Sequence, residues 1–461
     1  MEREDNRFDT QPIGQLMLKL SLPSIAAQMI NLLYNVVDRV FLGRIPGEGA
    51  MILAGLGITV PLINLINAFA VLIGSGGGPL LAIAAGKRNH KEVEKIMGNC
   101  TILLFLLSIV LTIVFGIFGS QLLTFLGADE TTLPYAAAYL KIYVLGTVFV
   151  MFSLGLTPFL IAQGFHKISM RNTFIGAGLN IILDPILIYG FHMGIAGAAI
   201  ATVISQGVSA ILVVVFLMGK QTTIRIRLTA LKTNIIGRVS SLGFASFFMT
   251  STESLVQAVF FQQLLKYGNS NHVAALSIMF SINQMIFLPI QGIGQGAQPI
   301  ISYNYGAGNV NRLKDAIRKM IVSNGMISFL GICIVELFPS LFLGIFTKDS
   351  NVLEIGIAGV RLYFLGRLFS GVQLGIQETF RAVGYGKTTI FNATMRKLVY
   401  LIPLTYLLPN LFGLGSRGVF LAESIADLLA VITAVIVFLI FKNQIYEKTR
   451  KNQSERIQKN T

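Results

Sequence analysis

Long apolar runs alternate with short polar connections along nearly the whole chain. A helix rises ~1.5 Å per residue, so a run of about 20 apolar residues is long enough to cross a hydrocarbon core of ~30 Å. Twelve such runs can be placed, centred near residues 30, 64, 108, 146, 181, 208, 252, 287, 331, 366, 401 and 429. The pattern therefore predicts an all-α integral membrane protein with twelve transmembrane helices.

Many glycine, proline and other residues of the first half recur at the same spacing in the second half. A shift of 220 residues, which becomes 221 after one inserted residue, superimposes identical residues. The matching pairs include Gly74 and Gly294, Gly76 and Gly296, Pro79 and Pro299, Tyr143 and Tyr363, Gly146 and Gly366, Gly197 and Gly418, and Ala201 and Ala422. Six spans return each half to the same side of the membrane. We therefore expect two six-helix lobes in a parallel repeat, related by a pseudo-two-fold axis along the membrane normal.

Two Gly-rich stretches, 74–78 and 292–296, lie inside apolar runs and are followed by Pro79 and Pro299. A phosphate-binding loop would need a preceding strand and a Lys-Ser/Thr ending, which neither stretch has. Small residues allow helices to approach closely in lipid, and a Pro frees a backbone carbonyl and bends its helix. We interpret both stretches as tight helix packing with a kink.

Shifts in polarity define the expected domains. Residues 1–16 are a polar N-terminal arm, and residues 17–219 form the N-lobe with spans one to six. Residues 220–237 are interpreted as a cytoplasmic inter-lobe linker, which forms either a short strand or an amphipathic segment on anionic headgroups. Residues 238–442 form the C-lobe with spans seven to twelve. Residues 443–461 are a charged cytoplasmic tail that we expect to be mobile.

Composition and charge point to lipid rather than to nucleic acid. Charged residues make up 12% of the 461 residues, compared with about 25% in a soluble domain. The net charge is +15, but with the N-terminus inside, 28 of the 36 Lys and Arg fall in inside segments, Arg396 and Lys397 among them. This is the positive-inside bias, and no basic cluster has the aromatic interleaving of a single-strand binder. We expect a multi-pass protein of the cytoplasmic membrane with both termini cytoplasmic.

The first span contains a polar stripe that ends in an acid. An ionised side chain at mid-bilayer costs ~2.5–3.5 kcal/mol on insertion scales, so its presence requires a reason. Helical spacing places four side chains on one face, with Tyr34 one turn before the last of them: Gln28, Asn31, Asn35 and Asp38. The alternative is an acid at the outer mouth that pairs with Arg39 or Arg44.

The fifth span contains a second acid. Asn180 and Asp184 are four residues apart, and Pro185 frees the carbonyl of Ile181. Hard cations such as Na⁺ prefer oxygen ligands of this type. A carboxylic acid in apolar surroundings can also exchange a proton near neutral pH. The spacing does not separate these uses from simple hydrogen bonding between helices, but together with Asp38 it favours an ion site.

The acidic residues of the second half lie in other spans than the equivalents of those that hold Asp38 and Asp184, or at other positions in them. Glu253 lies in the seventh span and is a candidate substrate or proton site. Glu378 and Arg381, three residues apart, are interpreted as a structural pair, and Glu423 and Asp427 lie in the twelfth span. Phe and Met side chains suit an adaptable apolar cavity, although core packing is the alternative for each. The candidate cavity residues are Gln28, Asn31, Asn35, Glu253, Gln257, Met279, Gln284 and Phe287.

An intramembrane enzyme is disfavoured. The four His residues all fall in connections, and Cys100 and Cys333 have no metal or redox spacing. Catalysis at depth would need a nucleophile–base pair or a set of metal ligands. We expect neither a cofactor nor a tightly bound metal.

These features together resemble the multidrug and toxic compound extrusion (MATE) transporters. The resemblance covers roughly residues 10–440 and rests on the twelve-span pattern, the segment 292–309 (GIGQGAQPIISYNYGAGN), and the segments Gly194–Ala199 and Gln377–Gly384. The chain is most similar to the prokaryotic branch with an acid in the first span and Asn-x-x-x-Asp-Pro in the fifth. The resemblance implies two lobes around a central cavity and export of organic cations and amphipathic drugs, driven by inward Na⁺ or H⁺.

Carried over residue by residue, the resemblance implies a cation site, with transient Na⁺ binding, at Asp38, Asn180, Asp184 and Thr202. We include Tyr34 in this coupling group because it lies one turn from Asp38. Pro23 would mark a bend in the first span that depends on ion occupancy. Glu253 corresponds to a second-lobe acid of another branch, whose tenth-span acid has no match in residues 366–373.

The resulting hypothesis is an antiporter. Entry of a proton or Na⁺ neutralises the Asp38 and Asp184 group, bends the first span at Pro23 and releases a cationic or amphipathic small molecule outward. We expect a monomer in the lipid bilayer. The alternatives are a channel and a lipid-linked oligosaccharide flippase. A flippase would need a strongly cationic cavity, whereas the intramembrane charge here is mainly acidic.

Overall fold

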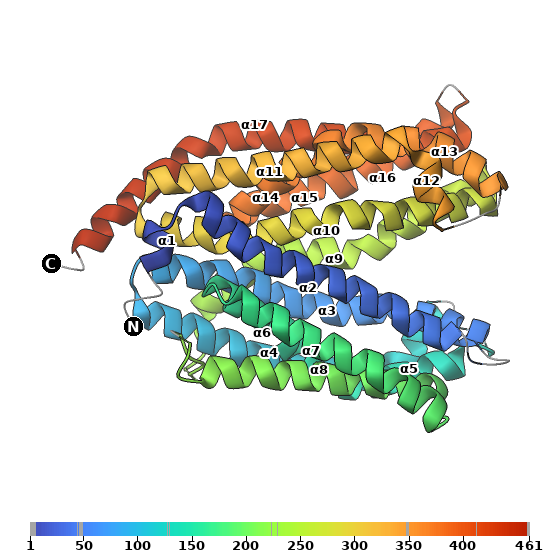
Figure 1. The fold of residues 1–461 in the computed structure, drawn as a ribbon, viewed down its shortest axis with the longest axis horizontal. Helices are drawn as coiled ribbons and strands as arrows, with labels where there is room; N and C mark the ends of the chain where they lie inside the picture. The colour runs from blue at the N-terminus through green and yellow to red at the C-terminus, as the bar shows by residue number, and fades with distance from the viewer. Residues whose placement is uncertain are drawn as a thin grey trace. The chain divides into compact units, whose positions relative to one another are not determined.

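The computed structural model describes residues 6–43, 45, 49–126, 128, 130–222, 224–227, 229–346, 350–411 and 413–458. These ranges are almost entirely helical and contain no strand (Figure 1). The chain divides into two compact units. Unit 1 holds the described residues from 26 to 251, and unit 2 holds those up to 25 and from 252 onward. Helices α2 and α9 therefore contribute residues to both units.

Unit 1 is a bundle around an apolar core that includes Ile66, Ile73, Leu104 and Phe159. In it α3 packs on α4 and α6, and α7 packs on α8 (Figure 1). Its elements are most of α2 (Ile13–Gly43), α3 (Gly49–Gly86), α4 (His90–Phe125), α5 (Leu133–Leu145), α6 (Thr147–Ala162), α7 (His166–Pro185), the π-helical turn η1 (Ile186–Gly190), α8 (Gly194–Met218) and the start of α9 (Thr233–Tyr267).

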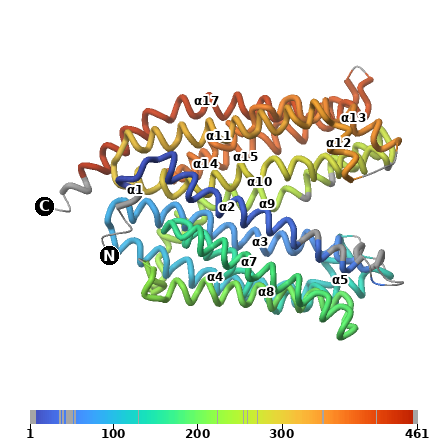
Figure 2. Tube along the Cα trace, viewed as in Figure 1, coloured from blue at the N-terminus to red at the C-terminus, as the bar shows by residue number. Residues whose placement is uncertain are grey.

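Unit 2 is a bundle with more interrupted helices. Figure 2 follows its trace, in which α10 packs on α11 and α17 packs on the pieces between residues 350 and 410. Its further elements are α1 (Asn6–Thr10), α10 (Ser270–Ala307), α11 (Val310–Leu337), α12 (Pro339–Gly344), α13 (Ser350–Phe364), the 3₁₀ turn η2 (Leu365–Phe369), α14 (Ser370–Ala382), α15 (Gly386–Thr394), the π-helical turn η3 (Met395–Leu401), α16 (Ile402–Leu407), η4 (Leu408–Asn410) and α17 (Gly415–Gln458).

All twelve apolar runs fall on a helix or on consecutive helical pieces. Within the described ranges, eight helices are long and apolar enough to cross a membrane, and the pair α5 and α6, which is bent by 61° at its junction, makes nine if it is counted as one span. The runs near residues 252, 366 and 401 correspond to α9, α13–α14 and α15–α16. These three runs are not among the spans counted above. The last two are broken into shorter pieces, and α9 carries Glu253 and several Ser and Thr residues.

The Gly-rich stretches pack closely, as expected. A Cβ added at Gly76 would collide with the backbone of Val239, and one added at Gly296 would collide with Ser21. The helices α3 and α10 nevertheless stay continuous through Pro79 and Pro299.

The repeat is visible in the packing of equivalent glycines. A Cβ at Gly146 would meet Val203, and a Cβ at its counterpart Gly366 would meet Ser424, which is the counterpart of Val203. Gly197 likewise lies against Leu187, and its counterpart Gly418 lies against Leu408. The two copies therefore share helix–helix contacts as well as residue types.

The expectation of a mobile tail is wrong for residues 443–458, which continue α17. Ile445, Thr449 and Asn452 are buried, and their spacing of four and three places them on one helix face. The side-chain amide of Asn452 donates to the Tyr305 carbonyl at 2.9 Å. The other residues of this segment are mostly charged or polar, so the sequence pattern does not reveal its buried face.

The N-terminal arm also packs on unit 2. The Phe8 ring stacks on Tyr303 at a centroid distance of 5.3 Å. Arg312 donates from Nε to the Phe8 carbonyl at 3.1 Å and from Nη2 to the Gln11 carbonyl at 2.6 Å.

The linker between residues 220 and 237 is neither strand nor helix at residues 224–227. It is held on unit 1 by two buried amide side chains. Gln163 Oε1 accepts hydrogen bonds from the Thr222 hydroxyl at 2.7 Å and from the Ile224 N–H at 3.0 Å. Asn99 Oδ1 accepts the Lys232 N–H at 2.6 Å. The exact lobe boundaries derived from the sequence stay a prediction.

Candidate functional site

The polar stripe of the first span lies on one continuous helix, α2, which runs through Pro23. Gln28, Asn31 and Asp38 are half-buried, and so is Tyr34. The side chains of Asn35 and Arg39, and Arg44 as a whole, lie outside the described residues. The stripe therefore presents a carboxyl group, an amide and a phenol along one side of α2.

The second acid lies at the end of α7, where the helix changes its winding. Asp184 is completely buried and Asn180 is 2% exposed. The Asn180 side-chain amide donates to Asp184 Oδ1 at 3.4 Å. Pro185 follows, and the chain continues as the π-helical turn η1. Such turns occur often at functional sites because they release backbone groups from the regular ladder.

Two tyrosines of α5 complete the group. Tyr139 and Tyr143 are buried, with stacked rings 6.1 Å apart. The Tyr139 hydroxyl is hydrogen-bonded to that of Thr202 on α8, and it lies within electrostatic range of Asp38, Tyr34 and Asp184. Asp38 and Asp184 also interact electrostatically with each other. The structure thus brings together Asp38, Asn180, Asp184, Thr202 and Tyr34, all from unit 1.

This arrangement has the chemistry of a site for a proton or a hard cation. Among the described residues, Asp184 Oδ2 and Asn180 Oδ1 are buried without a hydrogen-bond partner. A buried polar atom without a partner costs roughly 1–3 kcal/mol. A proton on the carboxylate, or a cation between these oxygens, would remove that cost and would also reduce the repulsion between the two acids.

The candidate cavity residues of unit 2 have varied surroundings. Gln284 is exposed, Gln257 and Phe287 are half-buried, and Met279 is fully buried in the core, where it lies against Gly359. Glu253 has an exposed side chain (58%), and its Oε2 pairs with Lys397 Nζ at 2.7 Å.

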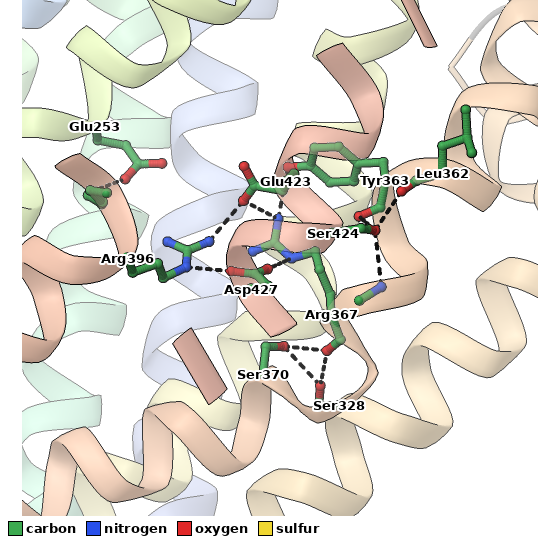
Figure 3. A network of polar contacts seen from close by, with 12 residues as sticks. Glu253, Ser328, Leu362, Tyr363, Arg367, Ser370, Arg396, Glu423, Ser424 and Asp427 are labelled. Carbon is green, nitrogen blue, oxygen red and sulfur yellow. Dashed lines mark hydrogen bonds and ion pairs between the residues drawn. The ribbon is translucent and has the colours of Figure 1, made fainter. Parts of the chain in front are cut away.

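Unit 2 holds a network of buried charges (Figure 3). Arg367 of η2 pairs with Glu423 at 3.0 Å and with Asp427 at 2.9 Å. Arg396 of η3 pairs with the same two acids of α17, at 2.8 Å and 2.5 Å. Both arginines therefore lie on irregular turns between helical pieces and meet one continuous helix. Glu378 and Arg381 pair separately at 2.8 Å, which confirms the structural pair.

Sequence reasoning missed several members of both groups. The sequence signal for Tyr139 and Tyr143 is the presence of two Tyr four residues apart in one apolar span. The positive-inside count places Arg396 and Lys397 in a connection, whereas in the structure both pair with acids of unit 2. Opposite charges inside predicted spans (Arg367 with Glu423 and Asp427) were the sign of a buried network.

Comparisons with known proteins agree with the fold. A sequence profile of the MatE family matches residues 23–186 and again 244–407, two copies offset by 221 residues, which confirms the parallel repeat. The chain is similar to the multidrug export protein MepA of Staphylococcus aureus (strain MSSA476), with 27% identity over 442 residues, covering 95% of this chain and 96% of MepA.

Two solved structures have the same fold. A MATE crystal structure in the bent conformation superimposes with a TM-score of 0.90 and 23% identity, covering 98% of this chain and 99% of that one. A MOP superfamily transporter from Pyrococcus furiosus, for which reverse polarity of the binding pocket is described, gives a TM-score of 0.89 and 23% identity over 97% and 99% of the two chains.

The family match covers most of the chain and both copies of the repeat. It confirms the twelve-helix, two-lobe fold and a multi-pass membrane protein, and the transporters of this family need no cofactor. The chain belongs to the MatE family of multidrug and toxic compound extrusion proteins, which are secondary transporters and not enzymes.

Proposed function

We propose that the chain exports organic cations and amphipathic drugs by antiport against H⁺ or Na⁺. The coupling ion binds at the group formed by Asp38, Asn180, Asp184 and Thr202. The observation that carries the proposal is the pair of interacting carboxyl groups from α2 and α7, together with the two buried oxygens that make no hydrogen bond within the described residues. The name of the similar MepA protein supports drugs as the cargo.

The driving force available to such a site is sufficient. One charge that crosses a potential of 100 mV gains ~2.3 kcal/mol. Because ~1.4 kcal/mol corresponds to a factor of ten, one coupling charge supports roughly 50-fold accumulation of the cargo on the far side.

The division of α2 between the units offers a route from ion binding to motion. The change of unit falls between Ile25 and Ala26, within one turn of Pro23, and Asp38 lies further along the same helix. Pro23 removes one backbone hydrogen bond and weakens the helix at this point. Neutralisation of Asp38 therefore acts on a helix that contributes residues to both units. This helix is weakened by Pro23 near the point where it passes from unit 2 to unit 1.

Efflux of ethidium from proteoliposomes, driven by either a Na⁺ gradient or a pH gradient alone, tests the proposal. We expect Asp38→Asn and Asp184→Asn each to abolish gradient-driven efflux while the protein remains folded. Asp315→Asn is the matched control, because this acid is exposed and pairs with Lys319 on the surface of α11. Normal efflux in both site variants would refute the role of the group.

A lipid-linked oligosaccharide flippase is the second candidate. Such an activity would require an excess of positive charge facing the pyrophosphate. In unit 2 the bases Arg367, Arg396 and Lys397 are matched by Glu253, Glu423 and Asp427. This balance of three acids and three bases leaves no excess of positive charge in the network for an anionic headgroup.

We further infer that both termini are cytoplasmic and that the protein works as a monomer in the cytoplasmic membrane. The positive-inside bias supports the orientation. Accessibility of a single cysteine in the C-terminal tail to an impermeant reagent, in a variant lacking Cys100 and Cys333, measures the orientation directly.

A further inference from the structure

Two residues of the charged network of unit 2 stand at positions that the repeat assigns to two residues of the unit 1 group that holds the candidate ion site. Tyr143 corresponds to Tyr363 under the shift of 220, and Thr202 corresponds to Glu423 under the shift of 221. The packing supports this alignment independently, because Gly146 lies against Val203 and Gly366 lies against Ser424. The helix break beside Tyr143 and α8 in unit 1 therefore matches the break beside Tyr363 and α17 in unit 2.

The two positions differ in charge. In unit 1, α8 contributes the neutral Thr202 and Gln206, whereas α17 contributes Glu423 and Asp427 at the same places. The residue after the glycine that both copies share (Gly146 and Gly366) is Thr147 in unit 1 and Arg367 in unit 2. Unit 2 thus adds two acids to this position and adds a guanidinium group with them.

Arg367 is held as a bound organic cation would be held. Its side chain is 5% exposed and pairs with Glu423 and Asp427, and its Nη1 donates to the Tyr363 hydroxyl at 2.8 Å. The guanidinium carbon lies 5.0 Å from the centroid of the Phe287 ring and 5.3 Å from that of Tyr363. Two carboxylates and two aromatic faces are the groups that recognise a delocalised cation.

We propose that Arg367 is a built-in cation: its guanidinium group fills, in the second copy of the repeat, the place that the first copy keeps for the coupling ion. Unit 2 then takes no coupling ion of its own, and one coupling site per chain remains, in unit 1. This inference rests on the proposed function, because it assigns the driving ion to unit 1 alone.

The charges of the network cancel, so the removal of one arginine should create a site for a free cation. Glu423 and Asp427 carry two negative charges, and Arg367 and Arg396 carry two positive charges. Removal of the Arg367 side chain leaves one uncompensated negative charge, two aromatic faces and a space shaped for a guanidinium group. A free monovalent cation of the same shape should enter this space, whereas a neutral molecule of the same shape should not.

The experiment uses the purified full-length protein in detergent and measures its melting temperature. The variant is Arg367→Ala, and the ligand is guanidinium chloride at roughly 1–20 mM, a range suited to a millimolar Kd. Urea at the same concentration is the neutral isostere, and sodium chloride matches the ionic strength. Arg381→Ala is the matched control, because Arg381 pairs with Glu378 on the following helix, apart from the network.

We expect Arg367→Ala to lower the melting temperature by roughly 10 °C, because it leaves a buried acid unpaired. Guanidinium should restore most of this loss in a saturable manner, and urea should not. Neither compound should stabilise the wild-type protein or Arg381→Ala. The double variant Arg367→Ala with Glu423→Gln, which removes one charge of each sign, should lose the response to guanidinium.

Two results would overturn the proposal. One is an Arg367→Ala protein that guanidinium stabilises no better than urea does. The other is a wild-type protein that binds guanidinium as well as the variant does. If Arg367→Ala can be purified in folded form only with guanidinium present, the proposal is supported, and if guanidinium rescues neither yield nor melting temperature, it is wrong. Because the readout is stability and not transport, failure here is distinct from normal efflux in Asp38→Asn, which would refute the proposed function.

Discussion

Gly366→Ala should loosen the contact on which the unit 2 network depends. Gly366 lies in η2, beside Arg367, and a Cβ at this position would collide with the main-chain carbonyl of Ser424 on α17. Backbone cannot rotate away as the end of a side chain can, so η2 and α17 must separate. The substitution therefore tests whether close approach of these two elements holds the ion pairs in place.

The expected cost follows from the contacts at this point. Overpacking of a tight site costs roughly 1–3 kcal/mol. The Gly366 N–H donates to the Ser424 hydroxyl at 3.0 Å, and the same hydroxyl donates to the Tyr363 carbonyl at 3.0 Å. Each such bond contributes about 1 kcal/mol. Lengthening of the Arg367 pairs with Glu423 and Asp427 adds to this loss, so we expect destabilisation of roughly 3–5 kcal/mol.

Thermal unfolding in detergent, followed by the fraction of monodisperse protein, measures the effect. A loss of this size corresponds to a fall in melting temperature of roughly 6–20 °C for a unit of this length. Gly344→Ala is the control, because a Cβ there would meet nothing within 4 Å. Gly146→Ala, the repeat counterpart, should cost less, since it meets the side chain of Val203 and not backbone. Equal melting temperatures for Gly366→Ala and Gly344→Ala would show that close approach of η2 and α17 does not hold the ion pairs in place.

Two further predictions concern the ion group and the N-terminal arm. Tyr139→Phe removes the hydrogen bond to Thr202, worth about 1 kcal/mol, and should raise the half-saturating concentration of the coupling ion about fivefold in the efflux assay. Tyr400→Phe, which loses a bond to Thr433 in unit 2, is its control, and equal values for both variants would contradict the prediction. Arg312→Ala removes two charge-assisted bonds to the arm and should speed amide exchange at residues 8–16. The exposed Arg318 provides the matched substitution, and unchanged exchange in Arg312→Ala would count against the role of these bonds.

Part of the candidate site could be found without a structure because its signals are local. Helical spacing alone places Asn180 and Asp184 on one turn, and an acid in an apolar span is costly wherever the span lies. The same argument singled out Asp38. The sequence could not show that α2 and α7 bring these two acids together, because their separation along the chain carries no information about their distance in space.

Two bases of the unit 2 network, in contrast, have no local signal in the sequence. Arg396 and Lys397 look like connection residues, since they lie among polar neighbours and fit the positive-inside count. Their partners are 27 and 144 residues away along the chain. Only the packing of η3 against α17 and α9 reveals that these charges are paired inside the unit.

The helices and the repeat can be predicted from the chain alone, because both follow from the period and spacing of apolar residues, glycine and proline. Which charges meet depends on how the helices pack. Each copy brings its broken helix against the same neighbour, but in unit 2 the acids of α17 face arginines, whereas in unit 1 the buried Asp184 faces Asn180. This difference matters because the stability of an ionised group in an apolar interior depends on the charges and polar groups within a few ångströms of it.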